Sequence, residues 1–143
     1  MTPFEMVEEF HKTYGVAVNQ PFNYDLVILR EDLINEELDE VFNETGTAEV
    51  INYQEGTFDW VPENIDRKKL TKELADLMYV TIGTAITFGL PLEEVFAEVH
   101  KSNMSKLGED GKPVYREDGK VLKGPNYKEP DLEKFKYPDW REI

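Results

Sequence analysis

Two segments of this chain combine the apolar spacing of a helix with carboxylates on the apolar face. In residues 26–42, apolar side chains recur at helical spacing around Leu33, and on a helical wheel Glu37 and Glu40 fall inside the apolar arc. The opposite arc, which would face solvent, carries the polar residues Asp32, Asn35 and Asp39. Because burying like charges is costly unless a cation binds them, the inward pair strongly constrains the fold.

A second inward pair lies in residues 70–90. After Lys72 that segment carries only two charged residues, Glu73 and Asp76, and both fall on the arc of Leu77 and Val80. Two helices that each direct carboxylates inward at i, i+3 form a site for a hard cation, and hard cations bind phosphates. The alternative is that these pairs are solvated faces, since the chain holds 30 Asp and Glu residues.

The composition narrows the classes of function. A net charge of −14 argues against binding a nucleic acid polymer, and the absence of Cys excludes disulfides and thiolate metal sites. We expect no signal peptide, because the first ten residues are acidic and amphipathic. We also expect no membrane span, because the uncharged run 77–92 is short and rich in Thr and Gly. A cytoplasmic location is therefore expected, in the host cytoplasm if the chain is phage-encoded.

The pattern predicts one domain of the all-α class with a C-terminal β-hairpin and tail. Four helices are expected, at residues 3–14, 25–44, 62–88 and 91–107. Thr2 and Glu5 form the capping box of the first helix, whose His11 is expected to pack in a partly buried position. The helical core is assigned to residues 1–107, with 45–61 as an insertion loop in which Ala48–Tyr53 is a short helix or strand. Residues 108–143 are assigned to the hairpin, with a two-residue Asp118-Gly119 turn, and to an extended tail.

Cationic residues gather late in the chain. Residues 101–128 hold seven Lys and Arg against four acidic residues, whereas the first hundred residues hold six against 21. Asn103 and Lys106 share the inner face of the fourth helix with Val95 and Val99, so we expect them to reach the phosphates of a substrate. The further candidate substrate-binding residues are Arg30 and Lys123. A solvated hairpin with ordinary lysines is the alternative.

At these residues the sequence resembles a known superfamily. The pattern Glu36-Glu37-x-x-Glu40, then Glu73-Leu74-Ala75-Asp76-Leu77, then Asn103-x-x-Lys106 is similar to the MazG-like all-α nucleoside triphosphate pyrophosphohydrolases. Residues 99–128 look like a subgroup of bacteria and phages often called phosphoribosyl-ATP pyrophosphohydrolase-like. One departure is the gap between the two carboxylate pairs, residues 41–72, which is longer than usual and is expected to reshape the base pocket.

The resemblance implies a helical bundle assembled as a homodimer or homotetramer. It implies Mg²⁺-dependent cleavage of a nucleoside triphosphate to the monophosphate and pyrophosphate in nucleotide-pool control, with Mn²⁺ as a possible substitute. The metal ligands it implies are Glu37, Glu40, Glu73 and Asp76. The candidate catalytic residues are Glu36, Glu37 and Glu40. Glu36 lies just off the inward face, where it either orients a water or acts as a base, or is a rim residue.

Three other functions stay open at this point. A pyrophosphohydrolase could act on phosphoribosyl-ATP or an alarmone instead. A non-enzymatic acidic bundle that binds a partner is the second. A di-iron carboxylate oxidase is the third, but it needs two Glu-x-x-His motifs and Glu8-x-x-His11 supplies one.

Overall fold

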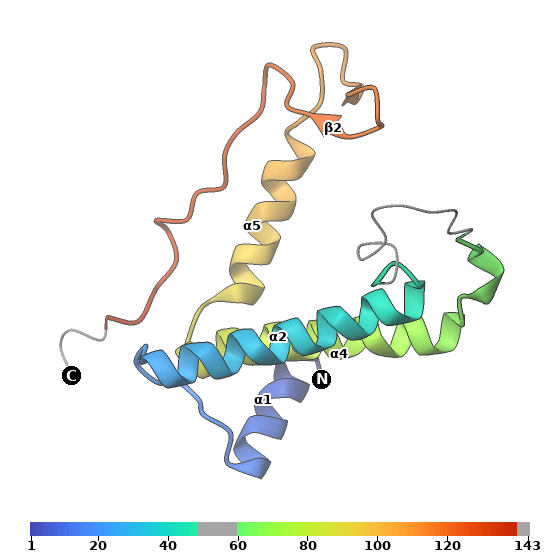
Figure 1. Ribbon diagram of the computed structural model, residues 1–143. Coiled ribbons are helices and arrows are strands. Elements are labelled where there is room, and N and C mark those ends of the chain that lie inside the picture. Colours follow the sequence, from blue (N-terminus) through green and yellow to red (C-terminus); the bar gives the residue numbers. More distant parts are fainter. Residues whose placement is uncertain (49–59, 140–143) are drawn as a thin grey trace. The chain divides into compact units, whose positions relative to one another are not determined.

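The computed structural model describes residues 1–48 and 60–139, which divide into two compact units, Met1–Gly89 and Leu90–Asp139 (Figure 1). The elements of the first unit are α1 (Pro3–Tyr14), α2 (Tyr24–Thr45), the 3₁₀ turn η1 (Pro62–Asn64) and α4 (Arg67–Phe88). Those of the second are α5 (Leu92–Met104), β1 (Val114–Tyr115) and β2 (Val121–Leu122). The predicted fold class, helical with a small hairpin near the C-terminus, is confirmed. The two units divide after residue 89. The assignment of residues 1–107 to a helical core, with 108–143 in the same domain, stays a prediction.

Helix α1 forms as its cap residues predict. The Thr2 hydroxyl accepts from the Glu5 amide at 3.2 Å, and the Thr2 amide donates to the Glu5 carboxylate at 2.6 Å. Gly15 ends the helix with a φ of 68°, a left-handed conformation that favours glycine. Val7 and His11 are the buried side chains of this helix, so its inner face lies on one narrow stripe.

Helices α2 and α4 lie side by side and run in opposite directions (Figure 1). Asn23 caps α2 by accepting from the Leu26 amide at 2.9 Å. Helix α4 begins at Arg67, so the prediction of one helix from Pro62 is wrong. The reason is Asp66, which takes the cap position by accepting from the amides of the second and third helical residues at 2.9 and 3.2 Å. Residues 62–64 form a separate 3₁₀ turn.

The connection between α1 and α2 forms backbone hydrogen bonds with the C-terminal end of α4. The amides of Asn19 and Gln20 donate to the carbonyls of Ile86 and Thr87 at 3.0 and 2.7 Å. Helix ends leave such carbonyls without intrahelical partners, so this connection satisfies them. The buried apolar core lies close by and consists of Val7, Ile82, Ala85 and Phe88.

The expected insertion between α2 and α4 lies mostly outside the described residues. Its C-terminal end returns to α2, because the Trp60 indole N–H donates to the Thr45 carbonyl at 2.8 Å. Of the predicted short element Ala48–Tyr53, all residues after Ala48 fall outside the described part.

In the second unit, α5 packs against the following tail. The Glu98 carboxylate accepts from the Asp131 amide at 2.9 Å and pairs with Lys134. The Ser102 hydroxyl donates to the Lys128 carbonyl at 2.7 Å. Glu98 and Ser102 are the buried side chains of α5. Their burial is compensated, because both form hydrogen bonds or ion pairs with groups of the tail.

The predicted inner face of that helix is wrong in part. Val99 and Asn103 are exposed, and the helix ends at Met104 rather than at 107, which leaves Lys106 beyond it. The end is set by Ser105, whose hydroxyl donates to the Ser102 carbonyl and accepts from the Lys128 amide. These bonds replace the next turn of helix.

The predicted hairpin is present, with a longer loop than expected. Val114 pairs with Leu122 and Tyr115 with Val121, and the Arg116 amide donates to the Lys120 carbonyl at 2.7 Å. Residues 117–119 therefore form a three-residue loop in place of the two-residue turn. Gly119 has a φ of 88°, which places it at the left-handed position typical of this loop.

No single helix among residues 1–48 and 60–139 is both long and apolar enough to cross a membrane, although α4 and α5 together reach that length and composition.

Candidate metal and substrate site

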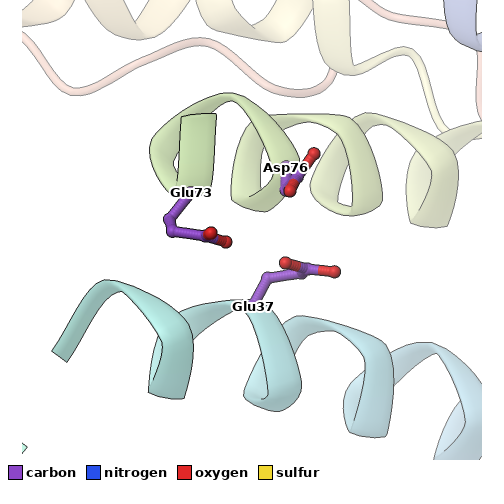
Figure 2. A group of neighbouring side chains, drawn as sticks. All are labelled: Glu37, Glu73 and Asp76. Carbon is purple, nitrogen blue, oxygen red and sulfur yellow. The ribbon is translucent and has the colours of Figure 1, made fainter. Parts of the chain in front are cut away.

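Three predicted metal ligands converge between α2 and α4. Glu37 of α2 faces Glu73 and Asp76 of α4 (Figure 2), and one carboxylate oxygen from each lies within 4.8 Å of the others. Glu73 and Asp76 are three residues apart, so both project from one face of α4. Glu73 is only 8% exposed. Carboxylate oxygens are the ligands that Mg²⁺ and Mn²⁺ prefer, so this donor set fits a hard divalent cation.

The electrostatics of Glu37 show that negative charge is concentrated here. Burial raises the pKa of the Glu37 carboxyl above its ordinary value, and the charges of Asp76 and Glu73 raise it further. Glu37 therefore ionises less readily than an ordinary glutamate while its neighbours are ionised. A bound cation would reverse that preference, so the site is electrostatically suited to a metal.

A lysine lies beside this cluster. The Lys72 ammonium is 2.7 Å from an Asp76 oxygen and 3.5 Å from a Glu73 oxygen. The hydrogen bond to Asp76 is the main reason that the pKa of Lys72 is raised. Sequence reasoning missed this residue, although its i, i+4 spacing to Asp76 was a usable signal. Lys72 thus partly neutralises the oxygens that a metal would bind.

Two other predicted acidic residues lie outside the group of three. Glu36 and Glu40 are exposed on α2. Glu40 is close enough that its charge contributes to the raised pKa of Glu37. Its assignment as a fourth metal ligand and the catalytic assignment of Glu36 stay predictions.

Arg30 is buried against α4 and is only 5% exposed. Its Nε donates to the Thr84 hydroxyl at 3.2 Å and its Nη2 to the Val80 carbonyl at 2.9 Å. Burial lowers the pKa of the guanidinium. Gly83 permits this contact, since a Cβ there would lie 2.6 Å from Arg30 Nη2 and 2.8 Å from His11 Nε2.

Arg30 and two of the three clustered carboxylates line one cavity of about 390 Å³. Glu37 and Asp76 line it together with Arg30 and His11, and the rings of Phe10 and Tyr79 are part of its wall. These two rings meet edge to face, with centres 5.6 Å apart. Its volume is typical of pockets that hold small ligands.

His11 keeps the packing position that the sequence predicted, although more deeply than expected. Its exposure is 3%, and its Nδ1 lies 3.0 Å from the Ala17 carbonyl. Because a carbonyl only accepts, Nδ1 carries the proton and Nε2 of the neutral ring presents a lone pair. Burial lowers the pKa of His11, and the charge of Arg30 lowers it further, so both favour the neutral ring.

The remaining predicted substrate residues lie in the second unit. Asn103 is exposed near the end of α5, and the carbonyl of Lys106 accepts from the Gly124 amide at 2.9 Å. Lys123 lies next in sequence to Gly124, and its ammonium is 4.6 Å from the centre of the Tyr127 ring. The backbone thus brings Lys106 close to the segment that carries Lys123. Their convergence with the carboxylates of the first unit stays a prediction.

Comparison with known families supports the resemblance seen in the sequence. The model of a family described as phosphoribosyl-ATP pyrophosphohydrolase matches residues 7–103, about two thirds of the chain. The match runs from within α1 to within α5 and contains all three clustered carboxylates. No curated protein matches the chain.

Proposed function

The chain belongs to the phosphoribosyl-ATP pyrophosphohydrolase family, and on that premise we propose that it hydrolyses a nucleoside triphosphate to the monophosphate and pyrophosphate. Family membership makes it a pyrophosphohydrolase that acts on phosphoanhydride bonds. The observation that carries the finer proposal is the convergence of Glu37, Glu73 and Asp76 within 4.8 Å. We further propose Mg²⁺ as the cofactor, replaceable by Mn²⁺, and a role in nucleotide-pool control.

The chemistry follows from the donor set. A divalent cation at these residues would neutralise phosphate oxygens and increase the electrophilicity of phosphorus. Glu37, Glu73 and Asp76 would hold that cation, and Glu36 would orient a water. Water adds to one phosphorus of the α–β linkage, the bond from that phosphorus to the bridging oxygen breaks, and the nucleoside monophosphate and pyrophosphate separate. The proton of the water passes to a carboxylate and then to solvent.

Phosphoribosyl-ATP is the second candidate substrate. The description of the matching family favours it directly. It carries the same triphosphate as ATP, so the three carboxylates would serve both substrates in the same way. The two candidate substrates differ in the phosphoribosyl group that phosphoribosyl-ATP carries in addition to the triphosphate.

Product analysis tests the proposed reaction. The protein is incubated with Mg²⁺ and each ribo- and deoxyribonucleoside triphosphate, or with phosphoribosyl-ATP, and products are followed by ³¹P NMR. Pyrophosphate is expected as the first product, and EDTA is expected to abolish turnover. Orthophosphate as the first product, or no turnover of any substrate, would contradict the proposal.

Matched variants connect that reaction to the site. Glu37→Gln and Asp76→Asn keep side-chain volume and remove a ligand charge, so each is expected to lower kcat roughly a hundredfold or more. Asp39→Asn is the control, because Asp39 is an exposed carboxylate on the same helix as Glu37. An active Glu37→Gln enzyme would remove the basis of the mechanism.

A further inference from the structure

Lys72 lies against the carboxylate cluster, which consists of Glu37, Glu73 and Asp76. Its ammonium is 2.7 Å from an Asp76 oxygen and 3.5 Å from a Glu73 oxygen. These are two of the three residues whose carboxylate oxygens come within 4.8 Å of one another. The side chain of Lys72 is nevertheless 68% exposed. Its ammonium is therefore accessible to a ligand that arrives from solvent.

A divalent cation at the cluster would compete with this ammonium. The cation would bind the oxygens of Glu73 and Asp76, at about 2.0–2.1 Å in the case of Mg²⁺, and its charge would repel the ammonium. Ion pairs between exposed side chains at i, i+4 contribute little to stability, so little holds Lys72 in its present position. A metal that occupies the cluster therefore releases the Lys72 ammonium from its carboxylate partners.

A released ammonium stays close to the cluster. Lys72 precedes Glu73 directly in sequence and lies one helical turn before Asp76 on α4. Mg²⁺ in sites of this kind is bound by carboxylates, waters and the phosphate oxygens of the substrate together. Phosphate groups on such a metal would therefore lie within reach of the flexible Lys72 side chain.

The charge of the occupied cluster favours one additional cation. Three ionised carboxylates and one divalent cation leave one net negative charge, which would repel a polyphosphate. The Lys72 ammonium brings that sum to zero. A lysine also suits the task, because an ammonium binds phosphate as a compact point charge and needs no fixed geometry.

The other cations of the first unit have other positions. Arg30 is buried and donates to the Thr84 hydroxyl and the Val80 carbonyl. Lys12 pairs with Glu8 at 3.0 Å. Among residues 1–48 and 60–89, Lys72 is the only cation that forms an ion pair with the cluster.

We propose that Lys72 binds the polyphosphate of the substrate, and that its ammonium moves from Asp76 and Glu73 to a phosphate oxygen when a divalent cation takes these carboxylates. This inference rests on the proposed function, because it requires a metal at the cluster and a polyphosphate on that metal. The ligand class is a polyphosphate whatever its base, so a nucleoside triphosphate, phosphoribosyl-ATP and inorganic tripolyphosphate all belong to it.

The alternative role of Lys72 is to neutralise the carboxylates of the metal-free protein and nothing more. Both roles predict that Lys72→Met binds a metal ion more tightly, because the variant lacks the competing ammonium. Only the proposed role predicts that the same variant binds polyphosphate more weakly once the metal is in place. Two binding constants that change in opposite directions therefore distinguish the two roles.

The experiment measures both constants on the full chain. Mn²⁺ binding without phosphate is followed by electron paramagnetic resonance, and binding of inorganic tripolyphosphate is measured by calorimetry with Mg²⁺ in excess. Lys72→Met is expected to bind Mn²⁺ several-fold more tightly and tripolyphosphate roughly fivefold or more weakly. Lys12→Met is the matched control, since it removes an exposed i, i+4 ion pair outside the cluster, and neither constant is expected to change.

A conservative variant tests whether charge is what matters. Lys72→Arg keeps the positive charge and is expected to bind tripolyphosphate within about twofold of the wild type. Tripolyphosphate binding as tight in Lys72→Met as in the wild type would overturn the proposal, whatever happens to Mn²⁺ affinity. An equal loss in Lys12→Met would overturn it as well, because the effect would then be one of general charge.

The outcomes also separate this inference from the proposed function. Turnover to pyrophosphate by the wild type, together with unchanged tripolyphosphate binding in Lys72→Met, would leave the proposed function standing and overturn the role of Lys72. A wild type that binds neither Mn²⁺ nor tripolyphosphate would overturn both.

Discussion

The Glu37 carboxylate suits metal binding but lowers the stability of the metal-free protein at neutral pH. Without metal its raised pKa means that the native state keeps the Glu37 proton at pH values where the unfolded chain has lost it. The contribution of Glu37 to stability is therefore fully present below the ordinary glutamate value of 4.5 and is lost as pH rises through the raised pKa. A metal ligand that destabilises the metal-free fold is a common compromise at functional sites.

Glu37→Gln tests this at neutral pH. The metal-free variant is expected to melt a few degrees above the metal-free wild type, because it removes an ionised carboxylate from the cluster. Above pH 4.5, its melting temperature should also fall less steeply with rising pH. Melting curves by circular dichroism in EDTA provide the measurement. A variant less stable than the wild type in EDTA would show that the carboxylate repulsion is unimportant.

Lys72 places a positive charge directly beside the carboxylates, which the sequence analysis did not predict. Lys72→Met keeps the aliphatic stem and removes the ammonium that pairs with Asp76 and Glu73. The metal-free protein is expected to melt lower, and the rise in melting temperature caused by Mg²⁺ is expected to grow, since Lys72 competes for the same oxygens. Lys69→Met is the control, as an exposed lysine of the same helix. An unchanged response to Mg²⁺ would exclude this competition.

At the scale of the elements, the close approach of α1 and α2 to α4 depends on Gly83. Gly83→Ala is expected to destabilise the protein by about 1–3 kcal/mol, because the new Cβ would overlap Arg30 and His11. In an exposed helix, replacing glycine by alanine would raise the stability. A loss of stability in Gly83→Ala would therefore show that the new Cβ is too close to its neighbours. Thr81→Ala is the control, at an exposed position two residues away. Urea denaturation measures both, and a stabilised Gly83→Ala would contradict the packing described here.

The element boundaries show what the sequence could predict. Caps with a clear local signal, such as Thr2 with Glu5, were placed correctly. Pro62 also gave a start signal, but it opens only a 3₁₀ turn, and Asp66 took the cap of α4. The early end of α5 could not be predicted, because it depends on contacts between Ser105 and the distant tail. Cap residues with a local partner can be predicted from the sequence, whereas a helix end that depends on a distant segment, such as that of α5, cannot.

The same distinction holds for the site. Apolar periodicity correctly brought Glu37, Glu73 and Asp76 together, because that pattern also determines how α2 and α4 pack. It could not predict that Glu40 is exposed while Glu37 faces α4. Nor could it show that Arg30 is buried, since burial of a cation depends on which groups of the neighbouring helix accept its hydrogen bonds.

For the whole molecule, the first unit leaves apolar side chains uncovered. Leu74 and Met78 are 50% and 51% exposed on α4. Burying such residues against a second copy would be favourable, so the predicted homodimer or homotetramer has a physical basis. Light scattering at micromolar concentration is expected to give the mass of a dimer or tetramer. Replacing both residues by Gln should lower that mass, and a monomeric wild type would refute the prediction.

The central claim is that Glu37, Glu73 and Asp76 form a divalent-cation site. Titration with Mn²⁺ followed by electron paramagnetic resonance tests it directly, without substrate or turnover. The account predicts saturable binding to the wild type and to Asp39→Asn, roughly tenfold or more weaker binding to Asp76→Asn, and competition by Mg²⁺. Equal Mn²⁺ affinity in the wild type and Asp76→Asn, or no saturable binding to either, would contradict it.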